Sequence, residues 1–248
     1  MSFSVADAQA ENQLIFEPYD MKSGVSAAAN LREAFATSRL LSAGYDRARL
    51  MIDANVMLIP TEEFSEDSMD LLYRNTFTSI GNSKVCFNVM PELNAVAVFA
   101  VDKDLRMVIG DHFGDVRVMP VSQPVWTHLY KKSFQGPWKK MYGYSHDRKL
   151  DIVSYQKGRF RFVNTFETDS AHDALYFLMY VWKQIGMDSE RDEMHIVGTI
   201  PQSEWLLTQL RSFVQKAYII NPSANFNRAP VTRLRDLPYD LMTLYLSR

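Results

Sequence analysis

The strongest constraint on the fold is an order of predicted elements that occurs twice along the chain. The order is clearest in the second half, which begins near Phe134. Three strands come first, and helices then alternate with strands to the end. The strands are WKKMYGYS, RKLDIVSYQ and RFRFVNTFE, and the later elements are a helix from Ser170, the strand EMHIVGTI, a helix from Ser203, the strand KAYIINP and a helix over 236–246. The predicted order is β-β-β-α-β-α-β-α.

The helix after the three strands has both of its ends marked in the sequence. Ser170 suits the N-cap, and Asp173 lies three residues on, where a carboxylate meets free backbone N–H groups. Apolar residues then recur at helical spacing as far as Ile185, and Gly186 suits the end of the helix. The next strand, 193–200, is too apolar to face water, which predicts a central strand in parallel pairing.

The second and third strands alternate in the way expected of half-buried strands. Leu150 and Ile152 face one way, while Phe160 and Phe162 alternate with arginines. Lys157-Gly158 between the two strands supplies the positive-φ residue of a tight hairpin. The four tryptophans, at positions 126, 138, 182 and 205, have core spacings and indicate packing rather than a platform for stacked bases.

The first half shows the same order with one loss and one insertion. Its elements are a hairpin of SFSVADA and QLIFEPY across Gln9–Asn12, a helix over 26–43, the strand RARLMIDA, a helix over 103–113, the strand DVRVMPV and a helix capped by Ser122. The first strand of the order is missing, because the sequence begins at what would be the second. We therefore predict an α/β fold with mixed sheets and two lobes, residues 1–133 and 134–248.

The insertion, residues 55–101, has a pattern of its own. It contains the strand VMLIP, the helix SEDSMDLLYRNTF behind Ser65, and a hairpin of KVCFNVM and NAVAVFAV. Its acidic run, TEEFSEDSMD over residues 61–70, suits a helix N-terminus, where the macrodipole favours negative charge. The insertion therefore predicts a separate strand-helix-strand-strand module.

Composition excludes several classes of protein. The formal net charge of −2 and the scattered basic residues argue against a nucleic-acid-binding polycation. A single cysteine, Cys86, makes an intrachain disulfide impossible, which fits a reducing compartment. No stretch has the roughly 18 apolar residues of a membrane span, and the first residues show no signal-peptide pattern. We therefore expect a cytoplasmic protein.

Motifs for metal-dependent or nucleophilic chemistry are missing from the sequence. None of the five histidines has another histidine or a cysteine at metal-ligand spacing, and no H-E-x-x-H, C-x-x-C, G-x-S-x-G or P-loop run occurs. His195 lies in an apolar strand and is interpreted as a hydrogen-bonded structural residue. Asp53 and Asp151 lie in separate lobes and do not make a two-metal nuclease site. No catalytic residue and no metal ligand is assigned.

Two lobes of this order, with a strand-helix-strand-strand module inserted in the first, resemble the actin-like ATPase fold of the ribonuclease-H-like class. The module is similar to that of the bacterial cell-division actin homologue, the type IV pilus actin-like protein and the cytoplasmic part of the type II secretion L protein. The segment LDIVSYQKGRFRFVNTFETDSAHDALYFLMYVWKQIGMDSERDEMHIVGTI resembles an uncharacterised bacterial family with this fold.

The resemblance implies where a nucleotide would bind. Active members hold ATP between the lobes, on hairpins with an acid-x-Gly pattern and on a strand followed by paired glycines. Here the hairpin of the second lobe, residues 144–149, has no glycine, and Thr199 follows Gly198 in the place of a second glycine. A bulky turn cannot supply the close main-chain cradle that phosphates need. The residues His146, Asp147, Arg148, Gly198 and Thr199 are thus candidates for a vestigial nucleotide site.

Three functions remain open at this point. The first is a non-catalytic scaffold that needs no cofactor and binds a protein partner through residues 55–101, where an unpaired sheet edge could add a strand. The second is an ATPase or nucleotide-dependent switch, and only this reading requires ATP and Mg²⁺. The third, a nucleic-acid-binding remnant of the fold class, is opposed by the near-neutral charge. The oligomeric state is left open.

Overall fold

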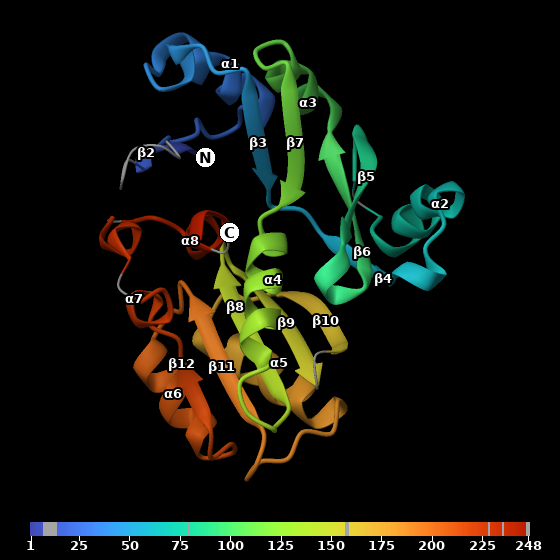
Figure 1. Cartoon of the computed structure of the whole chain (residues 1–248), viewed down its shortest axis with the longest axis vertical. Helices are drawn as coiled ribbons and strands as arrows, with labels where there is room; N and C mark the ends of the chain where they lie inside the picture. The colour runs from blue at the N-terminus through green and yellow to red at the C-terminus, as the bar shows by residue number, and fades with distance from the viewer. Residues whose placement is uncertain (7–13, 79, 157–158, 228, 235, 247–248) are drawn as a thin grey trace. The chain divides into compact units, whose positions relative to one another are not determined.

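The structure is a computed structural model that describes residues 1–6, 14–78, 80–156, 159–227, 229–234 and 236–246 (Figure 1). By its internal contacts the chain divides into two units, residues 1–89 with 95–121, and residues 90–94 with 122–248. Two predicted turns, Gln9–Asn12 and Lys157-Gly158, lie outside the described residues. Among the described residues, no helix is long and apolar enough to span a bilayer.

The first unit holds the hairpin, the helices and the module expected of the first half. Its elements are β1 (Ser2–Ala6), β2 (Leu14–Pro18), α1 (Ala27–Thr37), β3 (Arg47–Ile52), β4 (Val56–Pro60), α2 (Glu66–Thr76), β5 (Ser83–Met90), β6 (Ala95–Asp102), α3 (Lys103–Gly110) and β7 (Asp115–Pro120). β1 pairs with β2 in antiparallel fashion, and β3 pairs with β7 in parallel. Helices α1 and α3 pack together beside the β3–β7 pair around a core that includes Leu31 and Val108.

The predicted module forms a three-stranded sheet of its own within this unit. The strand order is β4-β6-β5, so β5 is an edge strand. Helix α2 covers one face of the sheet, where Tyr73 packs on Val85, Val96 and Val98. The Tyr73 hydroxyl also donates a hydrogen bond to the carbonyl of Asn55 (2.7 Å), which ties α2 to the start of the module.

The second unit is built on a five-stranded mixed sheet. Its elements are α4 (Ser122–Ser133), β8 (Lys140–His146), β9 (Lys149–Gln156), β10 (Arg159–Glu167), α5 (Ala171–Gln184), β11 (Glu193–Gly198), α6 (Ser203–Arg211), β12 (Ala217–Ile219), α7 (Pro222–Asn225) and α8 (Tyr239–Leu246). The strand order is β10-β9-β8-β11-β12. β8, β9 and β10 form an antiparallel meander, and β11 lies parallel to both β8 and β12. β11 is therefore an interior strand in parallel pairing, as its apolar sequence predicts, while β8 is the middle strand of the five.

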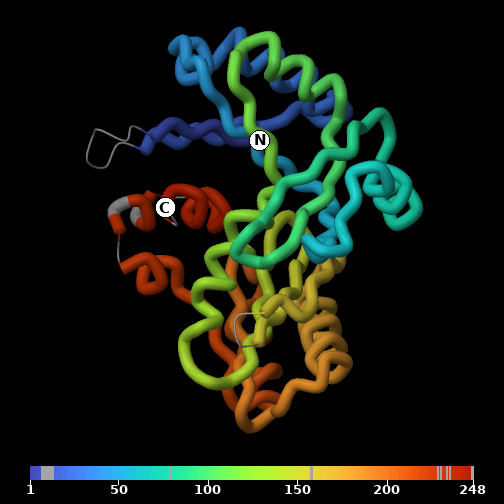
Figure 2. The backbone as a smooth tube through the Cα atoms, turned by 45° about the vertical axis from the view of Figure 1, so that its right-hand side comes forward, coloured from blue at the N-terminus to red at the C-terminus, as the bar shows by residue number. Residues whose placement is uncertain are grey.

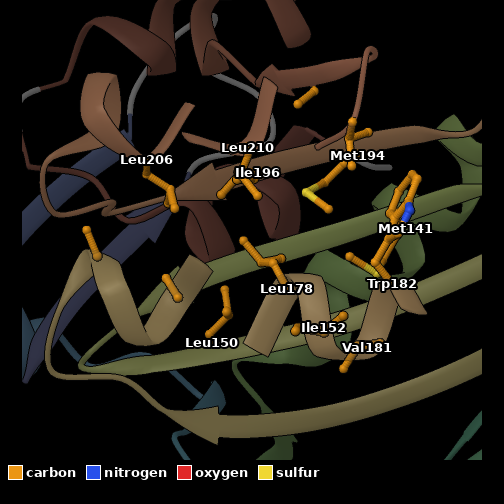
Figure 3. Packing of buried hydrophobic residues seen from close by; sticks show 14 residues of the cluster. Met141, Leu150, Ile152, Leu178, Val181, Trp182, Met194, Ile196, Leu206 and Leu210 are labelled. Carbon is orange, nitrogen blue, oxygen red and sulfur yellow. The ribbon is translucent and has the colours of Figure 1, made fainter. Parts of the chain in front are cut away.

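The hydrophobic core of this unit lies on one face of the sheet, under α5 and α6. Figure 3 shows Leu178, Val181 and Trp182 of α5 beside residues from the strands and from α6. The strand residues on this face are Met141, Leu150, Ile152, Met194, Ile196 and Ala217. Because side chains alternate along a strand, their neighbours in sequence point to the opposite face. Helix α4 crosses that opposite face over β8 and β9 (Figure 1).

The edge strand β10 carries an irregularity. Phe160 pairs with Tyr155 and Phe162 pairs with Ser154, so Arg161 is an extra residue in the ladder. The side chain of Arg161 bonds to Gln156 Oε1 (2.9 Å). The register shift is a β-bulge, which bends and twists the strand that contains it.

Several predicted ends differ from the structure. α1 ends at Thr37 rather than Ala43, because Ser38 turns to an extended conformation and a separate 3₁₀ turn covers Leu41–Ala43. The spacing of Phe213 from Leu206 and Leu210 predicts a place on the inner side of a helix over 203–214, but α6 ends at Arg211, and Phe213 lies beyond it and is 55% exposed. Trp138 is also on the surface, beside the cationic groups of Arg191 and Lys216 rather than in the core. The contact-based division assigns α4 to the second unit, whereas the sequence boundary at 133/134 assigned it to the first.

The two sides of α5 provide a test of the core. Leu178 is fully buried and Tyr176 is mostly exposed. We expect Leu178→Ala to lower the free energy of unfolding by about 3 kcal/mol, because the substitution removes buried methyl groups and leaves a cavity. The matched control Tyr176→Ala should cost less than about 1 kcal/mol. Urea unfolding followed by circular dichroism measures both, and equal effects would contradict this assignment of the core.

Candidate functional site

The five candidate residues lie together in the structure. Strands β8 and β11 are parallel, and Gly198 is paired with Ser145 at the ends of both strands. His146, Asp147 and Arg148 follow Ser145 directly, and Thr199 follows Gly198. We call residues 144–149 with 198–199 the strand-end site. In many open α/β sheets, ligands bind at the carboxyl ends of parallel strands, so this is where a vestigial site would be sought.

The turn of the strand-end site is a two-residue hairpin. His146 pairs with Lys149 in the ladder, and the residues between them, Asp147 and Arg148, have φ values of 40° and 61°. Two successive positive φ values are those of a type I′ turn, in which asparagine and glycine are the favoured residues. A non-glycine residue in this conformation carries a Cβ atom and a side chain close to the bend. The turn therefore lacks the bare main chain of a phosphate-binding loop.

The side chain of Arg148 is already engaged. Its Nε donates to Asp169 Oδ1 (2.8 Å), and both side chains are largely exposed. The carbonyl of Arg148 accepts a hydrogen bond from the amide of Thr168 (2.8 Å). An exposed ion pair of this kind contributes little to stability, about 0–1 kcal/mol, but it neutralises the one cation of the two-residue turn.

His146 does not point into solvent. Its side chain is only 10% exposed, and its ring stacks on that of Tyr144, with the centroids 4.5 Å apart. Nε2 of His146 lies 3.6 Å from Oδ2 of Asp151, a carboxylate that is itself 2% exposed. The other carboxylate oxygen of Asp151 accepts from the hydroxyl of Thr165 (2.7 Å). The tip of the hairpin is thus exposed at Asp147 and Arg148, while His146 belongs to a largely buried polar cluster.

The C-terminal helix contributes a carboxylate to the same cluster, and sequence reasoning missed it. Helix α8 packs along α4, as the red and yellow-green segments in Figure 2 show. Burial raises the pKa of Asp240, in its first turn, to about 6, and nearby His146 lowers that pKa in part. Burial also raises the pKa of Tyr144 strongly, and the neighbouring carboxylates of Asp240, Asp151 and Asp147 raise it further. The carboxylates of Asp147, Asp151 and Asp240 therefore all lie near enough to Tyr144 to raise its pKa.

An aromatic group holds α8 in this position. The ring of Tyr239 packs on Phe226 and lies near the rings of Tyr144 and His128. The side-chain amide of Asn225 donates to the Tyr239 hydroxyl (2.8 Å) and lies 2.9 Å from Nε2 of His128. Burial lowers the pKa of His128 to about 4, so this histidine is neutral at pH 7. The only sequence signal for this contact is the Pro-Tyr-Asp run before an apolar helix, which does not indicate where the helix docks.

Gly198 serves a close approach between strands. Its φ is +99°, and a Cβ atom built there would lie 2.0 Å from the carbonyl oxygen of Ser145. The amide of Thr199 donates to that same carbonyl (2.8 Å), and the Ser145 hydroxyl donates to the carbonyl of Thr199 (2.7 Å). The backbone amide and carbonyl of Thr199 are therefore both hydrogen-bonded to Ser145 of β8.

His195 takes part in a separate polar row on the α4 face of the sheet. Its Nε2 lies 2.9 Å from Glu193, which also pairs with the buried Lys140 (3.1 Å). The ring stacks between Tyr142 and Tyr218 on the flanking strands. This agrees with its interpretation as a hydrogen-bonded structural residue. Across the described part of the chain, no group of three or more His, Cys, Asp or Glu side chains is arranged to hold a metal ion.

Comparison with known proteins gives the family. A family profile described as "Protein of unknown function (DUF3822)" matches residues 1–217. The chain belongs to this family. No curated protein matches it.

Solved structures give the fold of this DUF3822 member. A protein from Bacteroides thetaiotaomicron, described as having an actin-like ATPase fold and unknown function, is 29% identical, with 94% of this chain and 91% of that chain covered and a TM-score of 0.82. The PilM–PilN type IV pilus biogenesis complex matches with 11% identity, coverage of 94% and 90%, and a TM-score of 0.54. The predicted actin-like ATPase fold and the resemblance to the pilus protein are confirmed.

Alanine at position 198 tests the close approach of β11 to β8. We expect Gly198→Ala to lower the free energy of unfolding by more than about 3 kcal/mol, because it combines an unfavourable φ with a clash against backbone. Gly186 is a matched control, since its φ is +63° and no atom lies within 4 Å of an added Cβ. Gly186→Ala should cost only about 1–2 kcal/mol. Comparable losses in chemical denaturation would show that the contact with Ser145 is not restrictive.

Asp240→Asn tests the buried carboxylate. The folded-state pKa of Asp240, about 6, lies above its ordinary value of 3.8, so its contribution to stability is greatest below pH 3.8 and declines as the pH rises through 6. Asparagine does not ionise. The variant should therefore gain about 2 kcal/mol relative to the wild type between pH 4 and pH 7. Urea titrations across that range measure the difference, and a gap that stays constant with pH would contradict the assignment.

Proposed function

We propose that this protein is a non-catalytic scaffold with an actin-like ATPase fold, and that it binds a protein partner through the module of residues 55–101. The proposal includes the two predicted lobes, residues 1–133 and 134–248. It also includes a cytoplasmic location, which the single cysteine supports because the chain can form no internal disulfide.

The observation that carries the proposal is the set of carboxylates at the strand-end site. Asp147, Asp151 and Asp240 all influence the Tyr144 hydroxyl electrostatically, and the guanidinium of Arg148 is paired with Asp169. A polyphosphate approaching the end of β8 would meet the exposed carboxylate of Asp147 and the negative potential of the two buried carboxylates, and no glycine lies in the turn to expose its amides. These features oppose nucleotide binding by this unit and favour a role that does not depend on it.

The module supplies surfaces suited to contact with another protein. Strand β5 is an edge of its sheet, and an edge strand can pair with a strand from another chain. Three large apolar side chains of the module are exposed: Leu71, Leu72 and Val89. A solved structure of the same fold, the PilM–PilN complex, is of a protein assembled with another protein. That precedent supports a scaffold role and says nothing of which partner this chain binds.

Nucleotide titration separates the scaffold from the alternative of an ATP-dependent switch. We expect no heat and no thermal shift when the full chain is titrated with Mg²⁺-ATP to millimolar concentration, because the strand-end site repels phosphate and has no amide cradle. Saturable binding in calorimetry would contradict the scaffold role and favour the switch.

Co-purification from the source cells tests the module. We expect the combined variant Leu71→Gln, Leu72→Gln and Val89→Gln to lose a protein that the wild-type chain retains, at least about tenfold by quantitative mass spectrometry. The control variant carries Tyr176→Gln, Tyr180→Gln and Phe213→Gln, three exposed apolar residues of the second unit. The control should retain the partner. If both variants keep the same set of proteins, the module is not the binding surface.

A further inference from the structure

The outer side of α2 differs from the rest of the module in its combination of exposed leucines and acidic residues. Leu71 is 65% exposed and Leu72 is 46% exposed, whereas the next residue, Tyr73, is 1% exposed and faces the sheet. Figure 1 shows α2 standing on one face of the β4-β6-β5 sheet. We use the name α2 outer face for a set of seven exposed residues: Glu66, Asp67, Asp70, Leu71 and Leu72 of α2, with Glu62 and Glu63 of the 3₁₀ turn Thr61–Glu63 that precedes the helix.

The charge of the α2 outer face is strongly negative. Its five carboxylates lie within nine residues of chain, and the next cation, Arg74, already pairs with Asp70 (2.7 Å). Among the residues that the structure describes, no salt bridge engages Glu62, Glu63, Glu66 or Asp67, and all four are exposed. The whole chain has a net charge of only −2, so negative charge is concentrated on this face relative to the rest of the protein.

Helix stability explains part of this pattern. Glu66 and Asp67 lie in the first turn of α2, where the macrodipole favours carboxylates. The dipole does not explain two adjacent exposed leucines on the same helix, because a leucine that stays in contact with water loses the free energy that its burial would give. Exposed apolar side chains close along the chain to several exposed carboxylates are the features of a binding face with a polar rim.

We propose that the α2 outer face binds a cationic amphipathic segment of the partner protein, in which apolar residues cover Leu71 and Leu72 and lysines or arginines meet the carboxylates. The inference rests on the proposed function and specifies the chemistry of the partner. The sign of the charge decides the class of partner, because nucleic acids and anionic lipid surfaces are both negative and would be repelled.

The size of the helix sets the size of the segment. α2 has 11 residues, which span roughly 16 Å. A segment of about three helical turns covers that length, and such a small contact gives weak, salt-dependent binding. The cations of the partner would raise the association rate, while contact with the two leucines would slow dissociation.

The test uses two fluorescent peptides of about 14 residues, with leucines at helical spacing and either lysine or glutamate at all other positions. Fluorescence anisotropy measures their binding to the full chain. We expect the lysine peptide to bind at least about tenfold more tightly than the glutamate peptide, and its Kd to rise several-fold between 50 and 300 mM salt.

Two variants locate the binding. Leu71→Gln with Leu72→Gln removes the anchors, and Glu62→Gln, Glu63→Gln and Asp67→Asn remove charge while keeping similar side-chain size. Each should raise the Kd of the lysine peptide about tenfold. The control, Tyr176→Gln with Tyr180→Gln on α5, should leave it unchanged. Thermal unfolding checks that each variant is folded. If the leucine variant does not fold, the charge variant still tests the inference.

The outcomes separate this inference from the function on which it rests. Equal binding of the two peptides, or equal Kd values for the wild type and both α2 variants, overturns the inference. If the cellular partner is nevertheless lost from the three-residue module variant, the scaffold role stands and only the cationic segment is wrong. If the partner is retained as well, both proposals fail.

Discussion

Strand β11 can keep its pairing with β8 as far as residue 198 only because that residue has no side chain, since a Cβ there would lie 2.0 Å from the carbonyl oxygen of Ser145. This close approach fixes the register of the two parallel strands. The register in turn decides which side chains face α5 and α6 and which face α4. It also uses the amide of Thr199 and the hydroxyl of Ser145 in bonds between the strands, so the same contact that orders the sheet occupies the main chain where a ligand would otherwise be held.

Local sequence patterns predicted most of the second unit. Ser170 and Asp173 form the capping box that their spacing indicates, because such a cap depends only on residues within one turn. The five candidate residues lie close together because β8 and β11 pair in parallel, and parallel strands end at the same edge of a sheet. Phe213 was misplaced because the end of a helix depends on the following turn rather than on apolar spacing alone.

Long-range contacts could not be predicted in the same way. Asp240 lies 92 residues after Arg148 in the chain, and only the docking of α8 brings it near His146. The sequence places His146, Asp147 and Arg148 in a single turn, but the structure divides them between a largely buried cluster and an exposed turn. The carboxylate of Asp240 thus reaches the strand-end site only through tertiary packing. The absence of glycine from the turn, by contrast, can be read directly from the sequence.

The β-bulge at Arg161 has a consequence for self-association. A strand from a second copy of the chain could extend the sheet only by pairing with the free edge of β10. The backbone N–H and C=O groups of that edge change register between Phe160 and Phe162, which disfavours such pairing. At the opposite border, β12 offers a template only three residues long. The larger sheet is thereby protected against strand addition at both of its borders, whereas β5 of the module is an eight-residue edge strand.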